Sequence, residues 1–552
     1  MGLVDEFRRW RLVQRGFSSG KKRRTADEKG LFWFLSRSHS VRSGIYLAFA
    51  LGFAALIYAT SGIEGLGKQG SLMVGGVLLT CAIAIFHLNH GVSAVRNGNV
   101  LLVFGGILFQ LWLIHLTRGI SSKWLPADAQ FLLIPMAFAP MVHSVLLGQR
   151  AGVYSSVFAS LFGALLISSE NRWPFLVLSL FCGLVAVFGT RNVRKRGKLL
   201  RAGFYVGIGG LLLGLLFGKI SMVGLNDVVE WQSFGQACLL SLGVGLVTGL
   251  VAGGILPMLE NVFDLTTEIT WLELSDLNHP LLRRMQLEAP GTFHHSLIVA
   301  ALSETAAEAI GADAIMSRVC AYFHDIGKLN KSEYFIENQG DVNPHDGLTP
   351  TMSALIIVAH VKDGVDLAIK NKLNPRIIEV IQEHHGDSLV YFFYRKAQER
   401  VEARECKGES SKNQDDLPKV DEKSFRYPGP IPQTRESGII SLADAVESAS
   451  RTLKKPSHGK IKALVNEIVL KRVRDGQLDA CGLNLSELTT IREVFSKTLR
   501  SMLHSRIEYP KDRVEDPPTG LGLEKGKVVS VESVERIRRQ RQGGLKKDGS
   551  CD

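Results

Sequence analysis

The stretch Cys320–Lys328 reads C-A-Y-F-H-D-I-G-K, and the interpretation of the whole chain starts from it. It places His324 directly before Asp325, and a neutral imidazole and a carboxylate are donors that divalent metal ions use. Gly327 lets the backbone come close to a ligand, and Lys328 can hold a phosphate. A single His-Asp pair is common on protein surfaces, so a metal site requires further ligands elsewhere in the chain.

Further histidines and aspartates recur at the ends, or on one face, of predicted helices. These candidate ligands are His295, His360, His384, His385 and Asp444. Only the second histidine of the doublet His294-His295 is predicted to be a ligand. Asp325 lies between the others in sequence and is the predicted bridge between two metal ions. Two metals about 3.5–4 Å apart can hold a hydroxide and clamp both the attacking and leaving oxygens of a phosphoryl transfer.

The donor set also predicts which metals bind. Mixed histidine and aspartate ligands without thiolates suit manganese or iron better than structural zinc. We therefore expect two divalent metal ions, most simply Mn²⁺ or Fe²⁺. The seven cysteines form no CxxC pair, so we expect neither a disulfide framework nor a zinc knuckle.

Apolar and charged residues are separated along the chain of 552 residues. The chain is 46% hydrophobic with a mean hydropathy of +0.11. Apolar residues crowd into the first half and charged residues into the second, which predicts a membrane domain followed by a soluble one. Much of the net charge of +12 lies beside the apolar runs. We attribute it to membrane topology and expect no nucleic-acid partner.

About eight apolar runs of spanning length lie between residues 44 and 263, each needing about 20 residues. The first is Ile45–Tyr58, and the others centre near Leu78, Gly106, Ala137, Phe158, Leu180, Gly210 and Leu246. With a cytoplasmic N-terminus, the strongly basic segment Arg191–Arg201 falls on the inner side, as the positive-inside rule requires. Eight spans return the C-terminal half to the cytoplasm.

One of these runs holds Pro135, Pro140 and His143. An ionisable residue inside a bilayer is a functional-site hypothesis, and its alternative is a histidine that packs helices near a kink. Paired broken helices and chains of acidic residues, which are typical of transporters, are not evident, so transport is disfavoured.

The predicted fold is all-α: a polytopic helical membrane domain followed by a helical soluble domain, because strand patterns are scarce after residue 280. The predicted boundaries are a basic N-terminus (1–43), a membrane domain (44–263), a juxtamembrane helix (264–280), a soluble domain (281–510) and a basic disordered tail (511–552). A polar, charged segment at 401–423 is predicted to be a flexible insertion, because its composition cannot bury a core.

Many short strings resemble one family. They include H-P-L-L-R-R (279–284), L-E-A-P-G-T-F-H-H-S-L (287–297), Y-F-H-D-I-G-K-L (322–329), E-H-H-G (383–386), F-R-Y-P-G-P (425–430) and L-A-D-A-V-E-S-A-S-R (442–451). This pattern resembles the HD-domain metal-dependent phosphohydrolases, and in particular the seven-transmembrane HD family of PgpH-type cyclic di-AMP phosphodiesterases. The resemblance is dense from about Leu256 to Pro510 and is mainly architectural in the membrane half.

The resemblance implies specific roles for the candidate residues. One metal would be held by His295, His324, Asp325 and Asp444, and the second by Asp325, His360, His384 and His385. The implied reaction is hydrolysis of cyclic di-AMP to pApA by a metal-activated hydroxide, with His324, Asp325 and Lys328 at the catalytic centre. Lys328 is also the candidate phosphate clamp. Arg451, Arg426 and Tyr427 are candidate substrate contacts, although Arg426 and Tyr427 could equally anchor a loop.

The resemblance also implies a location and partners. We expect a multi-pass protein of the bacterial inner (cell) membrane, with the N-terminus and the HD domain cytoplasmic. The expected partners are a cyclic dinucleotide and the lipid bilayer, and a homodimer is possible. Family members usually carry a large extracytoplasmic domain after the first span. Here only Ser61–Gly70 separates the first two apolar runs, which argues against regulation by an external ligand.

Two alternative functions stay open. The same fold could act on cyclic di-GMP, an alarmone or a deoxynucleotide, or the protein could be a receptor that binds a nucleotide without cleaving it. The cyclic di-GMP enzymes of the HD-GYP type should show G-Y-P after the later histidines, whereas this chain reads H-H-G-D-S-L-V-Y from His384. A receptor without catalysis would have no need of seven filled ligand positions.

Overall fold

The computed structural model describes residues 38–60, 75–76, 96–121, 131–167, 169–220, 228–263, 265–406, 420–453 and 456–503. Helices dominate this part of the chain, and its only β-type pairing is an isolated bridge between Leu389 and Arg426. The predicted all-α fold is therefore confirmed. By internal contacts, the described residues up to Ser501 are grouped in one unit.

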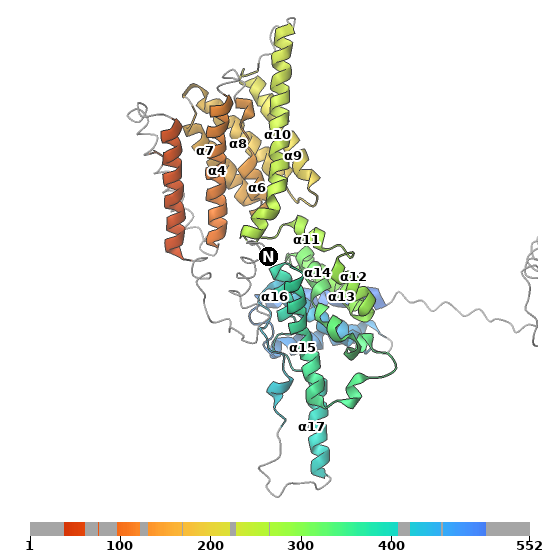
Figure 1. Cartoon of the computed structure of the whole chain (residues 1–552). Coiled ribbons are helices and arrows are strands. Elements are labelled where there is room, and N and C mark those ends of the chain that lie inside the picture. Colours follow the sequence, from red (N-terminus) through yellow and green to blue (C-terminus); the bar gives the residue numbers. More distant parts are fainter. Residues whose placement is uncertain are drawn as a thin grey trace, which may run out of the picture. The chain divides into compact units, whose positions relative to one another are not determined.

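The N-terminal half contains five helices long and apolar enough to cross a membrane (Figure 1). They are His39–Thr60, α4 (Asn97–Ser121), α8 (Arg172–Gly189), α9 (Gly197–Leu216) and α10 (Val228–Phe263). Two shorter helices, α6 (Phe138–Leu147) and α7 (Gln149–Leu165), lie between α4 and α8 in sequence. These helices make the chain a multi-pass membrane protein. The predicted span near Leu78 lies outside the described residues.

An aromatic cluster packs the first helix against α4 and α7. The ring of Phe162 lies 5.3 Å from that of Phe49 and 4.8 Å from that of Phe53, in both cases edge-on. Phe104 of α4 contacts Phe49 at 5.2 Å. Edge-to-face geometry is favourable for aromatic pairs beyond the area they bury, so these rings fix how the three helices meet.

Glycines bring α9 and α10 into backbone contact. A Cβ atom on Gly203 would overlap the carbonyl oxygen of Gly245, and one on Gly249 would lie 2.6 Å from the carbonyl oxygen of Leu199. Small residues four apart allow this close approach between membrane helices, where van der Waals packing replaces the hydrophobic effect as the source of association.

The apolar run near Ala137 is not one continuous helix. A 3-10 turn, η2 (Phe131–Leu133), precedes α6, which has only 10 residues. Pro135 interrupts the run and leaves backbone groups without helical partners. Gln110 of α4 satisfies two of them: its Nε2 donates to the carbonyl of Pro135, and the backbone amide of Ala139 donates to its Oε1. His143 of α6 is buried and donates from Nε2 to the carbonyl of Leu102 on α4. This hydrogen bond joins α6 to α4, as expected for a histidine that packs helices.

The C-terminal half is a compact set of helices with short connections. They are α11 (Glu268–Leu274), α12 (Pro280–Glu288), α13 (Pro290–Ala309), α14 (Ala314–Phe323), η4 (Ile326–Tyr334), η5 (Ile336–Asn338), η6 (Pro344–Gly347), α15 (Pro350–Lys370), α16 (Pro375–Glu383), α17 (Tyr391–Cys406), η8 (Glu422–Phe425), α18 (Arg435–Ser450), α19 (His458–Arg474) and α20 (Leu485–Leu503).

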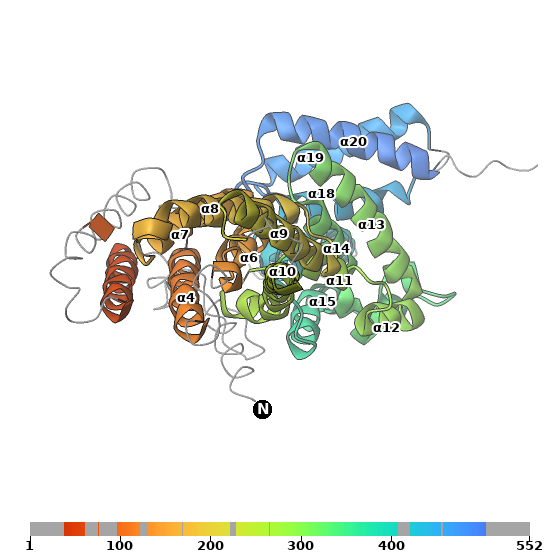
Figure 2. The same cartoon turned by 90° about the horizontal axis from the view of Figure 1, so that it is seen from above.

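Prolines and capping side chains start these helices where the site needs them. Proline occupies the first turn of α12, α13, α15 and α16, where its missing N–H costs no intrahelical bond. Thr349 and Thr434 cap α15 and α18 through their side-chain oxygens. Helix α13 packs against α14 and α18 (Figure 2).

Several predicted segments differ from the structure in extent or are not described. The juxtamembrane segment contains only the seven-residue helix α11. Residues 401–406 of the predicted insertion continue α17, whereas 407–419 lie outside the described residues, as do residues 504–552 with the predicted tail.

Candidate metal centre

The predicted ligands come from five helices that meet in the C-terminal half. His295 lies in the second turn of α13, and Asp444 lies in α18. His324 ends α14 and Asp325 begins η4. His360 is in α15, and His384 with His385 follows α16. Six of the seven are buried, and His385 is nearly so. His294, which was not predicted to be a ligand, is exposed.

The first group contains His295, His324, Asp325 and Asp444, with one donor atom from each within 4.8 Å of the others. Nε2 of His295 lies 3.5 Å from Oδ2 of Asp325 and 3.1 Å from Oδ1 of Asp444. Nε2 of His324 lies 3.3 Å from the same Asp325 oxygen. Four donors from three parts of the sequence therefore surround one point.

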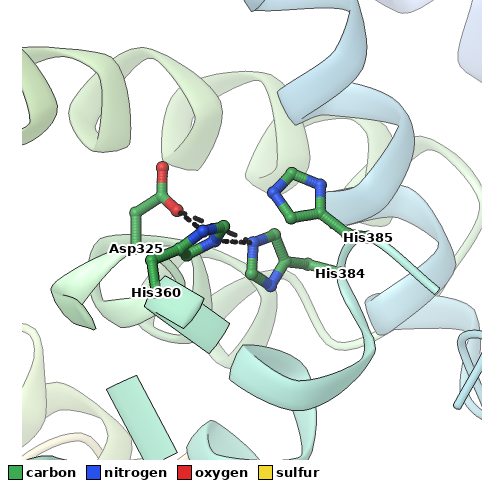
Figure 3. Close-up of side chains that lie close together, drawn as sticks. All are labelled: Asp325, His360, His384 and His385. Carbon is green, nitrogen blue, oxygen red and sulfur yellow. Dashed lines mark hydrogen bonds and ion pairs between the residues drawn. The ribbon is translucent and has the colours of Figure 1, made fainter. Parts of the chain in front are cut away.

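The second group contains Asp325, His360, His384 and His385, within the same 4.8 Å limit. Oδ1 of Asp325 lies 3.4 Å from Nε2 of His360 and 3.6 Å from Nε2 of His384. Figure 3 shows these side chains facing one another, with His385 beside His384. Asp325 thus directs one carboxylate oxygen to each group, which is the arrangement of a bridging ligand.

Backbone carbonyls orient three of the imidazoles. Nδ1 of His324, His360 and His384 donates to the carbonyl oxygen three residues earlier, at 2.7, 2.6 and 2.8 Å respectively. A carbonyl can only accept, so Nδ1 carries the proton and Nε2 presents its lone pair. Such second contacts fix the ring orientation and tautomer of metal-binding histidines.

Buried atoms without partners show that the cluster fits a cation. Nε2 of His295, Nε2 of His324 and Oδ1 of Asp325 are buried and have no hydrogen-bond partner in the described part of the chain. Leaving buried polar atoms unpaired is costly. All three point into the two groups, so these residues fit a pair of divalent metals.

The charges in the cluster also suit metal binding. Burial lowers the pKa of His360 to about 4 and that of His385 well below the ordinary range, so both are neutral at pH 7. Burial alone would raise the pKa of Asp325, but the charge of Lys328 opposes this change, and the pKa lies well below its usual value. His360, His385 and Asp325 are therefore a pair of neutral imidazoles and an ionised carboxylate, the forms that bind metals.

Lys328 is held beside the cluster rather than projecting freely. Its Nζ lies 2.7 Å from Oδ2 of Asp325 and 2.8 Å from Oε1 of Glu337. Glu337 also accepts a hydrogen bond from the hydroxyl of Thr292 at the start of α13. The lysine thus ties Asp325 to η5 and, through Glu337, to α13. To clamp a phosphate as predicted, its ammonium would have to bind the phosphate while it keeps these two carboxylates.

Glu447 was not found by sequence reasoning. Its Oε2 accepts a hydrogen bond from Nδ1 of His295, and its Oε1 accepts from the guanidinium of Arg451. Glu447 lies one turn after Asp444 in α18, and this spacing next to a predicted ligand was the available signal. The predicted substrate contact Arg451 is therefore directed toward a carboxylate that orients a ligand.

The F-R-Y-P-G-P segment contributes Tyr427 and Arg426. The ring of Tyr427 is buried and stacks on His385, with centroids 4.3 Å apart. Arg426 forms an ion pair with Glu422 and donates to the carbonyl of Asp387. Tyr427 supports His385, and Arg426 anchors the loop that follows His385 by its bond to Asp387.

Gly327 has a packing role that the sequence did not indicate. A Cβ atom at this position would overlap the carbonyl oxygen of His360, so only glycine lets η4 pack directly on α15. The predicted approach of this backbone to a bound ligand stays a prediction. The contact sets the spacing between Asp325 and His360.

Two family profiles match the chain. Residues 69–267 match the 7TM receptor with intracellular HD hydrolase, and residues 292–449 match the HD domain. The chain belongs to the family of 7TM receptors with an intracellular HD hydrolase. The second match begins at Thr292 and includes all seven residues of the two groups, so the cluster lies within the HD domain of this family.

Relatives in this family carry informative names. The chain is 35% identical over 448 residues to the cyclic-di-AMP phosphodiesterase PgpH of Bacillus subtilis (strain 168), covering 80% of this chain and 60% of that protein. It is 34% identical to the protein of the same name from Listeria monocytogenes serotype 1/2a (strain 10403S), covering 76% of this chain and 55% of that protein. The chain therefore spans about three fifths of the length of these relatives.

A solved structure also matches the C-terminal half. The crystal structure of the L. monocytogenes phosphodiesterase PgpH HD domain in complex with cyclic-di-AMP is 40% identical. The match covers 42% of this chain and 100% of that one, with a TM-score of 0.37.

Proposed function

We propose that this protein is a membrane-anchored, metal-dependent phosphodiesterase that hydrolyses cyclic di-AMP to pApA. The observation that carries the proposal is the position of Asp325, whose two carboxylate oxygens face two buried groups of donors. The proteins named cyclic-di-AMP phosphodiesterase that match most of this chain support the choice of substrate.

The proposed ligands divide as the sequence predicts. His295, His324 and Asp444 would hold one metal, the three histidines His360, His384 and His385 would hold the other, and Asp325 would bridge them. Mn²⁺ and Fe²⁺ suit these oxygen and nitrogen donors. When bound, the pair would supply Lewis acidity that activates water and stabilises the charge on the phosphodiester.

The remaining residues would position the reacting groups. Lys328 keeps Asp325 ionised and placed, because its ammonium contacts Oδ2 of that carboxylate. Tyr427 holds His385 in orientation by stacking. Lys328, Arg451, Arg426 and Tyr427 remain candidate substrate contacts, and each would have to reach the nucleotide while keeping the partner that the structure gives it.

The topology supports a cytoplasmic HD domain. The connection between α8 and α9 exposes Arg191, Arg194, Lys195 and Arg196, and the positive-inside rule favours a cytoplasmic position for it. Helix α9 then crosses outward and α10 crosses back, so Phe263 at the end of α10 is on the cytoplasmic side. We infer that the HD domain follows in the cytoplasm and that the membrane is the bacterial cell membrane.

A substrate panel tests the proposal. The full-length chain, purified in detergent and loaded with Mn²⁺, is given cyclic di-AMP, cyclic di-GMP, an alarmone and a deoxynucleotide separately. We expect pApA from cyclic di-AMP and slower or no turnover of the others. Preferential cleavage of another nucleotide would reassign the substrate, and binding of cyclic di-AMP without cleavage would favour the receptor alternative. The same preparation shows by native mass whether the chain is a homodimer.

A further inference from the structure

We propose that Arg472 in α19 is the cation that binds a phosphate of the nucleotide at the metal centre. The inference rests on the proposed function for the identity of the nucleotide, but not for the place of the site. Sequence reasoning did not single out Arg472, because it lies in a basic helix end, K-R-V-R, that reads as a solvated surface.

The end of α19 is fastened to the loop that follows His385. Nε2 of Gln477 donates to Oδ1 of Asp387 at 2.5 Å, and the amide of Asp387 donates to Oε1 of Gln477. A Cβ atom on Gly386 would overlap the side-chain oxygen Oε1 of Gln477, and Gly386 has a φ of +58°, so this position requires glycine. The amide of Gln477 in turn donates to the carbonyl of Arg472. These bonds place Arg472 on the His385 side of the cluster.

A second contact brings α19 to the same place. Helix α19 packs on α18, the helix that carries Asp444. His385 and Asp444 face each other, with Nδ1 of His385 3.5 Å from Oδ2 of Asp444. The charge of Arg472 acts on the carboxylate of Asp444 and on the hydroxyl of Tyr427, whose ring stacks on His385, so Arg472 lies on this side of the cluster.

Arg472 is half-buried, and one nitrogen of its guanidinium is fully buried. Its Nη1 is inaccessible to solvent and has no hydrogen-bond partner in the described part of the chain. Burial lowers the pKa of Arg472, and the charge of Asp444 opposes that change from a distance, without a direct ion pair. Arginine keeps its proton in proteins, so Arg472 is a half-buried positive charge with one buried donor that is not used.

The other cations near the cluster already have carboxylate partners. Lys328 contacts Asp325 and Glu337, Arg451 contacts Glu447, and Arg426 contacts Glu422. A planar guanidinium fork matches the oxygens of a phosphate, and such charge-assisted hydrogen bonds are stronger than neutral ones. A phosphate held at the metal centre would supply the partner that Arg472 lacks.

Arg472 could instead only balance the charge of Asp444, and the test separates these roles. The full-length chain and its R472Q, R472K and R474Q variants are loaded with Mn²⁺. Arg474 is exposed on the same helix and serves as the matched control. Binding of pApA and of inorganic phosphate is measured by calorimetry, together with the KM and kcat for cyclic di-AMP, metal content and Tm.

We expect R472Q to bind pApA and phosphate roughly 10- to 100-fold more weakly, as the loss of a charged hydrogen bond predicts. KM should rise more than kcat falls, metal content and Tm should match the parent, R472K should recover part of the affinity, and R474Q should behave as the parent. Unchanged binding by R472Q, or loss of metal and of Tm in parallel with binding, would overturn the proposal. A parent chain that binds phosphate but cleaves no cyclic dinucleotide would refute the proposed function, and the binding comparison would still decide the role of Arg472.

Discussion

Nδ1 of His295 lies 2.5 Å from Oε2 of Glu447, although the two residues are 152 positions apart in the chain. Burial disfavours a charge on His295, but the three carboxylates around it, Asp325, Asp444 and Glu447, outweigh burial and raise the pKa of the imidazole. The contact directs Nε2 of His295 into the first group of donors. Glu447 is thus the outer partner of a proposed metal ligand.

Replacing Glu447 by glutamine should weaken metal binding without removing a ligand. Outer partners of metal-binding histidines typically contribute 10–100-fold in metal affinity. We expect a competing chelator to remove Mn²⁺ from E447Q at a chelator concentration about 10–100-fold lower than the parent requires. E467Q, at an exposed position of α19, is the control. Equal chelator midpoints for E447Q and the parent would refute the orienting role.

Gly327→Ala should disrupt the spacing between η4 and α15. The added methyl group would overlap the carbonyl of His360, a backbone atom that cannot move without moving a proposed ligand. Overpacking of this kind costs about 1–3 kcal/mol or more. We expect a lower Tm and weaker metal binding, measured on the same sample. Gly340→Ala, where a Cβ would meet no atom within 4 Å, should behave as the parent.

Glu383 should make stability fall between pH 4.5 and 7. It is buried and accepts hydrogen bonds from the amide of Gln433 and the hydroxyl of Ser437, and burial raises its pKa to about 7. The folded chain therefore keeps this proton at pH values where the unfolded chain has lost it. Stability from the protonated form is complete below pH 4.5 and is lost as pH rises through 7.

Glu383→Gln should remove this dependence. At pH 8 the variant should be more stable than the parent by at most about 3 kcal/mol, and the difference should shrink toward pH 5. Thermal unfolding of both chains across this range measures it, with Glu333→Gln as an exposed control. Parallel curves for the parent and Glu383→Gln would show that Glu383 is already ionised in the folded chain.

Metal removal should destabilise the HD domain. Three buried donor atoms of the cluster have no partner among the described residues, so a bound cation satisfies atoms that are otherwise unpaired. Ligand present at 100 times its Kd stabilises a fold by about 2.7 kcal/mol. We expect EDTA to lower the Tm of the parent and Mn²⁺ to restore it. In Asp325→Asn both effects should be small, and an EDTA shift as large as in the parent would argue against this site.

The sequence predicted the candidate ligands best where histidine and aspartate recur at the ends of predicted helices. His324, Asp325, His384 and His385 each follow a helix predicted from apolar periodicity, and the all-α fold follows from the same pattern. The structure gathers these four with His295, His360 and Asp444, although their roles as metal ligands stay predictions.

The missed residues owe their position to tertiary contacts. Glu447 and Glu337 read as ordinary helical carboxylates, because the His295 and Lys328 atoms that they meet are brought there by packing. Arg472 reads as part of a solvated basic stretch, because the Gln477–Asp387 contact that fastens the end of α19 to the loop after His385 is made by packing. A kink near Pro135 was an alternative from the sequence, but the contact with Gln110 of another helix, which stabilises the break, could not be predicted.

The release of pApA from cyclic di-AMP, measured against the number of Mn²⁺ ions bound per chain, tests the central claim most directly. The account predicts that the full-length chain is inactive without metal and reaches full activity near two ions per chain. It also predicts that Asp325→Asn binds less metal and releases no pApA. Full activity in a metal-free chain, or undiminished release by Asp325→Asn, would contradict it.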